Sequence, residues 1–150
     1  MPADDLHRLF PELAASTYQI TSQIDLCYNC IAWAADDTER KWWPFAYPPM
    51  GYWPDGVDRN ETVECFIAAF ATLDYSTCEN GDLEHGFEKV AIYADGADVT
   101  HMARQLPSGV WTSKLGDLED IEHAELEAIV CDIYGEPVQF LKRPIPSATA

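Results

Sequence analysis

Basic residues are scarce in this 150-residue chain: nine Lys and Arg stand against 26 Asp and Glu, which gives a formal net charge of −17. Nucleic-acid binding draws most of its affinity from Lys and Arg that neutralise phosphates, so this composition excludes that class of partner. An anionic membrane surface would repel the chain for the same reason. A basic protein partner, or a neutral or cationic substrate, remains compatible with the charge, although an acidic surface also serves solubility alone.

Long apolar runs are absent as well, and no segment approaches the roughly 20 residues that a membrane-spanning helix needs. The N-terminus, MPADDLHRLF, is acidic where a signal peptide would be basic. We therefore expect a cytoplasmic protein. Hydrophobic residues make up 47% of the chain, enough for one core. We expect a single domain over 1–150, with a helical N-terminus over 1–17, a core over about 18–144 and a flexible tail over 145–150.

The cysteines are odd in number and irregularly spaced, which argues against a complete disulfide framework and favours free thiols in a reducing compartment. They are Cys27, Cys30, Cys65, Cys78 and Cys131. Cys27 and Cys30 form a CxxC, but there is no βαβ pattern for a redox site and no second close pair for a zinc site. We expect no metal and no cofactor.

An acidic stretch over 117–123 is expected to be irregular or briefly helical. Its carboxylates lack the glycine and the alternation of a calcium-binding loop, so a solvated face is the simpler interpretation. These carboxylates belong to Asp117, Glu119, Asp120 and Glu122.

Hydrophobic spacing predicts helices in the first half of the chain and strands in the second. It indicates a short helix over 4–15 interrupted at Pro11, a helix that opens at Cys30 with Asn29 as its cap, and a longer helix over 60–73. Alternating or β-branched segments predict strands over 89–94, 99–106, 110–115 and 137–142. Helices followed by an antiparallel sheet define an α+β fold.

The segment 41–54, KWWPFAYPPMGYWP, holds four prolines and a glycine, which forbid a regular element. We expect an irregular loop packed by its own rings. The loop is either clamped to the core or forms one wall of a substrate groove. The tryptophans assigned to such a groove are Trp33, Trp42, Trp43 and Trp53.

Cys30 is the best-placed thiol for nucleophilic chemistry, because unpaired N–H groups and partial positive charge at a helix start favour the thiolate. The acidity of the chain opposes this, so a local cation is needed, and His101 is the candidate. If Leu106 pairs with Val110 across a hairpin, positions 101 and 113 share a face and the Ser113 hydroxyl can orient the imidazole. Asn29 or the Cys30 N–H would supply an oxyanion donor.

These residues resemble a known family. A Cys at the start of a buried helix, followed by a helix and then by a sheet whose first strands carry a His, resembles the papain-like cysteine hydrolases, nearest to their NlpC-type and CHAP-type branch. The segments YNCIAWA, THMARQLPSGVWTSKLG and DIEH, followed by YGEPVQFLKRP, are similar to a group of small uncharacterised bacterial proteins with this presumed fold. The resemblance spans about 18–144 and implies N-terminal helices packed on a small antiparallel sheet. It implies Cys30 as nucleophile, His101 as base and a third polar residue where Ser113 stands. The family usually has His, Asn, Asp or Gln there, so Asp120 and His123 remain alternatives.

Two functions follow from this resemblance. In the first, Cys30 attacks an amide carbonyl and His101 passes its proton to the leaving amine. The substrate would be a peptide, a peptidoglycan stem or a glutamine side chain, and hydrolysis, deamidation and acyl transfer stay open.

In the second, a catalytically silent papain-like fold serves as an acidic protein-binding or immunity-like module, with the aromatic loop as its anchor. Its partner would be a basic protein such as a toxin or nuclease. An enzyme needs Cys30 and His101 in contact beside an open groove, whereas a binding module tolerates a buried Cys30 whose pKa is not lowered.

Overall fold

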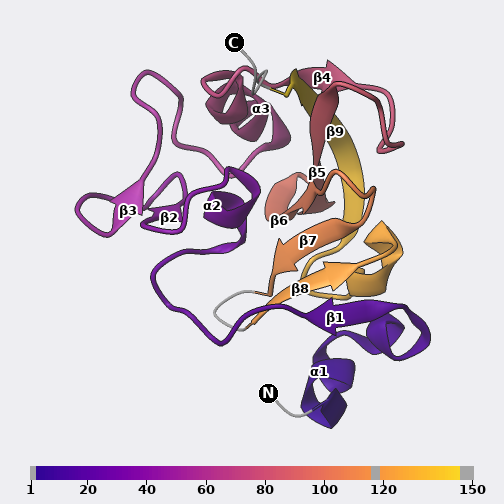
Figure 1. Cartoon of the computed structure of the whole chain (residues 1–150). Coiled ribbons are helices and arrows are strands. Elements are labelled where there is room, and N and C mark those ends of the chain that lie inside the picture. Colours follow the sequence, from indigo (N-terminus) through magenta and orange to yellow (C-terminus); the bar gives the residue numbers. More distant parts are fainter. Residues whose placement is uncertain (1–2, 116–118, 146–150) are drawn as a thin grey trace.

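Figure 1 shows the computed structural model of the chain, which describes residues 3–115 and 119–145. The chain folds into an α+β structure around one seven-stranded sheet, in which every neighbouring pair of strands is antiparallel. The strand order is β1-β8-β7-β6-β5-β9-β4. Their bounds are β1 Tyr18–Ile20, β4 Ser76–Cys78, β5 Phe87–Asp95, β6 Asp98–Gln105, β7 Trp111–Lys114, β8 Asp120–His123 and β9 Glu136–Pro144.

The helices begin where the sequence provides caps. In α2 (Cys30–Ala34), the Asn29 side chain accepts a hydrogen bond from the Ala32 N–H at 3.0 Å, as the sequence predicts. In α3 (Val63–Ala71), the Thr62 hydroxyl caps the first turn. The predicted N-terminal helix is split into α1 (Ala3–Leu9) and the 3-10 helix η1 (Pro11–Ala15), because proline cannot continue the hydrogen-bond ladder. A second 3-10 helix, η2, covers Leu126–Ile129.

The two faces of the sheet support two separate apolar clusters. Alternation along β5 sends Val90 and Ile92 to the first cluster and Ala91 and Tyr93 to the second. The first cluster, which we call the helix face, includes residues of α2 and α3. The second, which we call the turn face, includes residues of α1, η1 and η2. Figure 1 shows α2 and α3 together on one side of the strands and α1 beside β1. Both faces of the central strands are therefore buried.

The hairpin between β6 and β7 has the predicted register. The Leu106 N–H donates to the Val110 carbonyl at 2.8 Å, and Gln105 lies opposite Trp111. The four predicted strands are all present, and β5 and β9 extend beyond the predicted bounds because they pair along most of their length.

Besides β8, two short strands and one short pairing were not predicted. β1 and β4 are three-residue edge strands with mostly exposed side chains, so they carry no hydrophobic alternation. Within the aromatic loop, β2 (Lys41–Trp42) and β3 (Gly51–Tyr52) form a two-residue parallel pair. The loop is otherwise irregular, as expected.

The acidic stretch departs most from its prediction. Asp117 lies outside the described residues, but 120–123 form strand β8 rather than a helix or an irregular segment. The carboxyl-bearing residues Glu119 and Asp120 are buried, so the expected solvated face is wrong for them. Asp120 tolerates burial because its Oδ2 accepts a 2.6 Å hydrogen bond from the Tyr28 hydroxyl.

Candidate functional site

Cys30 opens α2 on the helix face of the sheet. Its side chain is 8% exposed and packs in the same cluster as Met102 of β6. Because α2 packs against β6 and β7, the residues of these strands that point toward the helix face are the ones nearest the thiol. Met102 carries a thioether there, which cannot accept a proton from a nucleophile.

The thiol of Cys30 is held in its neutral form. Burial raises the pKa of Cys30 to about 11, and backbone hydrogen bonding from Met102 and Ile31, together with the charge of Lys114, only partly opposes that rise. The backbone N–H groups at the start of α2, which favour the thiolate, are therefore present as the sequence suggests. The cost of burying a charged thiolate is larger than their effect, so the pKa of Cys30 rises. The sulfur is poorly exposed and stays protonated at neutral pH.

His101 lies on the opposite, turn face. Its imidazole stacks on the Tyr134 ring with centroids 4.2 Å apart, and it meets the edge of the Tyr93 ring at 5.2 Å. Both tyrosines belong to the turn-face cluster, whereas Cys30 belongs to the helix-face cluster. The sheet itself thus separates the two members of the expected catalytic pair, and the structure does not bring them together.

The predicted contact between His101 and Ser113 is present. The His101 Nε2 and Ser113 Oγ atoms are 3.0 Å apart, and the same hydroxyl lies 2.8 Å from His123 Nε2. His123 Nδ1 lies 2.8 Å from the Glu125 carbonyl, which only a donor can satisfy. With His123 neutral, its Nε2 must accept from the Ser113 hydroxyl, and His101 Nε2–H must donate to Ser113 Oγ. The chain of hydrogen bonds runs in one direction from His101 to Glu125.

This chain is a buried, uncharged network. Burial lowers the pKa of His101 well below its usual range, with a further lowering from His123. Burial also lowers the pKa of His123, partly opposed by its bond to the Glu125 carbonyl. His101 Nδ1 has no hydrogen-bond partner among the described residues, so a proton placed there would be buried without an acceptor. Both imidazoles are neutral at neutral pH.

The two alternative orienting residues lie on different faces. His123 reaches His101 through Ser113, whereas Asp120 lies across from Lys114, on the Cys30 side. There, Lys114 is fully buried, with its Nζ 5.0 Å from the centre of the Tyr28 ring, and the Tyr28 hydroxyl donates to Asp120. Burial and the Asp120 carboxylate raise the pKa of Tyr28. The ionisable residues on the Cys30 side of the sheet therefore include a lysine, a tyrosine and an aspartate that sequence reasoning did not group.

Asn29 has a structural role. Its Oδ1 accepts from the N–H groups of Ala32 and Trp42, each at 3.0 Å, and its Nδ2 donates to the Trp42 carbonyl at 2.8 Å. The side chain thereby caps α2 and ties it to β2. These bonds engage Asn29 in the scaffold rather than presenting it to an oxyanion.

The four tryptophans assigned to a groove instead pack into the core. Trp42 and Trp53 are each 3% exposed, and Trp33 and Trp43 are partly buried against the helix-face cluster. Three of the indole N–H groups have intramolecular acceptors: Thr112 Oγ1, Asp37 Oδ2 and the Asp58 carbonyl. Of the two expectations for this loop, the structure shows the one clamped to the core.

The exposed part of the loop is its tip. Phe45, Tyr47 and Met50, which we call the aromatic tip, are 56%, 63% and 61% exposed. The Arg59 guanidinium donates to the carbonyls of Pro44 and Ala46 and lies over the Tyr47 ring at 4.5 Å. The spacing of the prolines does not identify this tip, since Tyr52 and Trp53 also lie between prolines but are less exposed.

All five cysteines are free, with Cys27 exposed and Cys30 buried. Within residues 3–115 and 119–145, no three His, Cys, Asp or Glu side chains are grouped to hold a metal ion. In the same part of the chain, no helix has the length and apolar character to cross a membrane.

Comparison with known proteins gives one match. Residues 19–142 match a family described as "Domain of unknown function (DUF7689)", so the match covers most of the chain and nearly all of the sheet. No curated protein and no solved structure matches the chain.

Proposed function

The chain belongs to the DUF7689 family, and we propose that it is a catalytically silent papain-like fold that serves as an acidic protein-binding module for a basic protein. The observation that carries the proposal is the position of Cys30 and His101 on opposite faces of the sheet. The papain-like element is the Cys30 helix packed on an antiparallel sheet. The catalytic pair of such hydrolases is missing from it.

The chemistry at Cys30 supports a silent site. A thiol nucleophile needs a base within hydrogen-bond reach, about 2.6–3.2 Å. Cys30 instead packs beside Met102, has a pKa raised to about 11, and is nearly inaccessible to a substrate carbonyl. His101 donates its Nε2 proton to Ser113 and stacks on Tyr134, so it is used in core packing.

The aromatic tip supports a binding role. Large exposed apolar side chains at a loop end are typical of interface anchors, since Tyr, Phe and Met are enriched at interface centres. Arg59 holds the tip through two carbonyl hydrogen bonds and its stacking on Tyr47. A tip fixed in this way loses little conformational entropy on binding.

The negative net charge of the chain favours a basic partner. A net charge of −17 repels acidic surfaces and accelerates encounter with basic ones. A basic protein with an apolar cleft is complementary to both features, because the tip supplies apolar area and the net negative charge of the chain supplies long-range attraction.

The test compares proteins retained from an extract of the source organism by the immobilised wild-type chain and by a tip variant. The variant carries Phe45→Ser, Tyr47→Ser and Met50→Ser. We expect one basic protein to be retained by the wild type and lost with the variant. The purified pair should then bind with 1:1 stoichiometry, and the tip variant should weaken binding about tenfold or more.

A matched control removes three exposed apolar side chains outside the tip. These are Leu83→Ser, Val138→Ser and Ile20→Ser. The control should retain the partner with unchanged affinity. Equal loss in the control and the tip variant would contradict a role for the tip, and Cys30-dependent cleavage of an amide substrate would contradict the silent site.

A further inference from the structure

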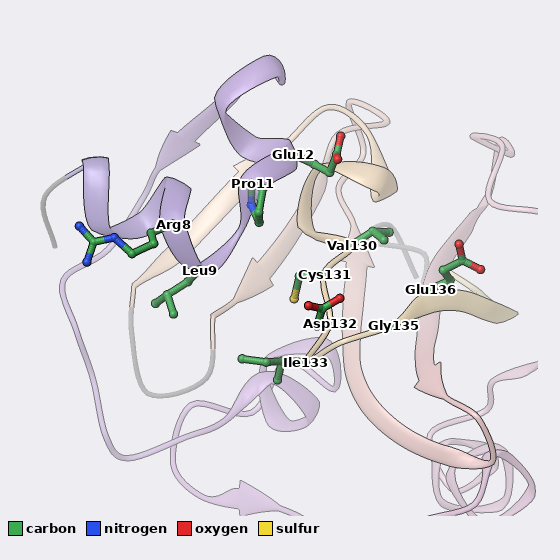
Figure 2. Close-up of a pocket in the computed structure, with 10 residues that line it drawn as sticks. All are labelled: Arg8, Leu9, Pro11, Glu12, Val130, Cys131, Asp132, Ile133, Gly135 and Glu136. Carbon is green, nitrogen blue, oxygen red and sulfur yellow. The ribbon is translucent and has the colours of Figure 1, made fainter.

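A second surface on the turn face has the shape of a binding groove. Two adjoining pockets, of about 610 and 440 Å³, share Glu12, Val130 and Glu136 in their walls. We call them together the acidic groove. α1 and η1 form one wall, and the turn over 130–135 with the start of β9 forms the other (Figure 2).

Both apolar and acidic side chains line this groove. Leu9 and Ile133 are 41% and 63% exposed, and Figure 2 shows them at the same end of the first pocket, away from Glu136. Four exposed carboxylates line the groove. They are Glu12, Glu127, Asp132 and Glu136.

The carboxylates of the groove are not neutralised within the molecule. None of the four forms an ion pair with any residue that the structure describes. Of the described residues that line the groove, Arg8 is the only basic one, and its Nη2 lies 3.3 Å from Asp5 Oδ1. The groove therefore has a concentrated negative charge beside exposed apolar surface.

The turn that forms one wall is fixed before any ligand binds. The Gly135 N–H donates to the Cys131 carbonyl at 2.8 Å, and the Tyr134 N–H lies 3.4 Å from Cys131 Sγ. Gly135 has a φ of +70°, and a Cβ there would collide with the Ala94 carbonyl. Beneath the turn, Tyr134 stacks on His101. A preformed wall lowers the entropic cost of binding a flexible segment.

We propose that the acidic groove binds an extended basic segment of a protein partner that carries both Lys or Arg and apolar side chains. The cationic side chains would lie against the four carboxylates, and the apolar ones against Leu9 and Ile133. Charge complementarity selects this occupant, because an acidic or neutral segment would leave the carboxylates without counter-charges. The inference rests on the proposed function only in assigning a basic partner.

The test uses a blocked hexapeptide of alternating Lys and Leu, with two comparison peptides in which Glu replaces Lys or Ser replaces Leu. Binding is followed by amide chemical shifts of the labelled full-length chain. We expect the Lys-Leu peptide to shift amides of α1, η1, the turn over 130–135 and Glu136. The Glu-Leu peptide should not bind, and the Lys-Ser peptide should bind more weakly.

Two variants test the groove directly. The double variant Asp132→Asn with Glu136→Gln should lower the affinity for the Lys-Leu peptide about fivefold, because two exposed charge contacts are lost. Ile133→Ser should lower the affinity for the same peptide by a similar factor, because an apolar contact is lost. All three positions are exposed, so both variants are expected to fold.

Matched controls distinguish a groove from general attraction to an acidic protein. They are Asp55→Asn with Glu64→Gln, and Leu83→Ser, which change exposed positions outside the groove. These controls should keep the affinity within about twofold. Equal weakening by control and groove variants, or shifts spread over the whole surface, would overturn the proposal. The peptide test leaves the aromatic tip unchanged, so its failure is separable from failure of the proposed function.

Discussion

The His101 imidazole stacks on the Tyr134 ring with an interplanar angle of 16°. This pairing fixes the histidine on the turn face, where its Nε2–H meets Ser113. On the other face, Cys30 packs beside Met102. Because neighbouring residues of β6 point to opposite faces of the sheet, Met102 rather than His101 faces Cys30. This arrangement is why we propose a binding module rather than a hydrolase.

The buried histidines predict a loss of stability in acid. Because the pKa of both His101 and His123 is lowered in the folded protein, the unfolded chain binds more protons below about pH 6.5. The free energy of unfolding should fall as pH drops from about 7 to 5, by up to about 1.4 kcal/mol per pH unit for each histidine. Urea unfolding at several pH values measures this slope.

His101→Gln removes one of these groups and should reduce that slope relative to the wild type. His85→Gln, at an exposed histidine, is the matched control and should leave the slope unchanged. Identical slopes in all three proteins would contradict neutral burial of His101.

The Ser113 hydroxyl joins the two imidazoles, so its removal should be costly. Ser113→Ala would leave His101 Nε2–H without an acceptor and His123 Nε2 without a donor, in a buried site. We expect a loss of about 1–3 kcal/mol in the free energy of unfolding. Ser76→Ala, on the exposed edge strand β4, should change stability by less than about 0.5 kcal/mol. Chemical denaturation of both variants makes the comparison, and equal small effects would speak against the hydrogen-bond chain.

Gly135 should be intolerant of a side chain. Its φ of +70° and the close approach of the Ala94 carbonyl leave no room for a Cβ, so Gly135→Ala should cost more than about 1 kcal/mol. At Gly96, φ is +61° but nothing lies within 4 Å of the added Cβ. Gly96→Ala therefore has only the conformational cost of a positive φ, and it should lower the melting temperature less than Gly135→Ala does. A larger loss of stability in Gly96→Ala than in Gly135→Ala would mean that the turn in the wall of the acidic groove can shift.

Local patterns in the sequence predict much of this arrangement. The alternation of β6 and β7 and the hairpin between them correctly predict that His101 contacts Ser113. Asn29 is recognisable as the α2 cap from residue type and position. These predictions succeed because they depend on residues close together in the chain or across one tight turn.

The face on which α2 packs could not be predicted in this way. Alternation shows which residues share a face, but both faces of β5 and β6 are buried here, so hydrophobicity does not distinguish the face toward Cys30. The burial of β8 was missed for a related reason. Its acidic residue Asp120 is tolerated through the distant Tyr28, 92 residues away in the chain.

The central claim is that Cys30 is not activated by His101, and thiol alkylation tests it most directly. The folded wild type and His101→Gln are treated with iodoacetamide from about pH 5 to 9, and the rate at each cysteine is read from its peptide. We predict that Cys30 reacts more slowly than the exposed Cys27 at every pH, and that His101→Gln leaves the Cys30 rate unchanged within about twofold. Rapid modification of Cys30 below pH 7 that disappears in His101→Gln would contradict the account and restore the hydrolase hypothesis.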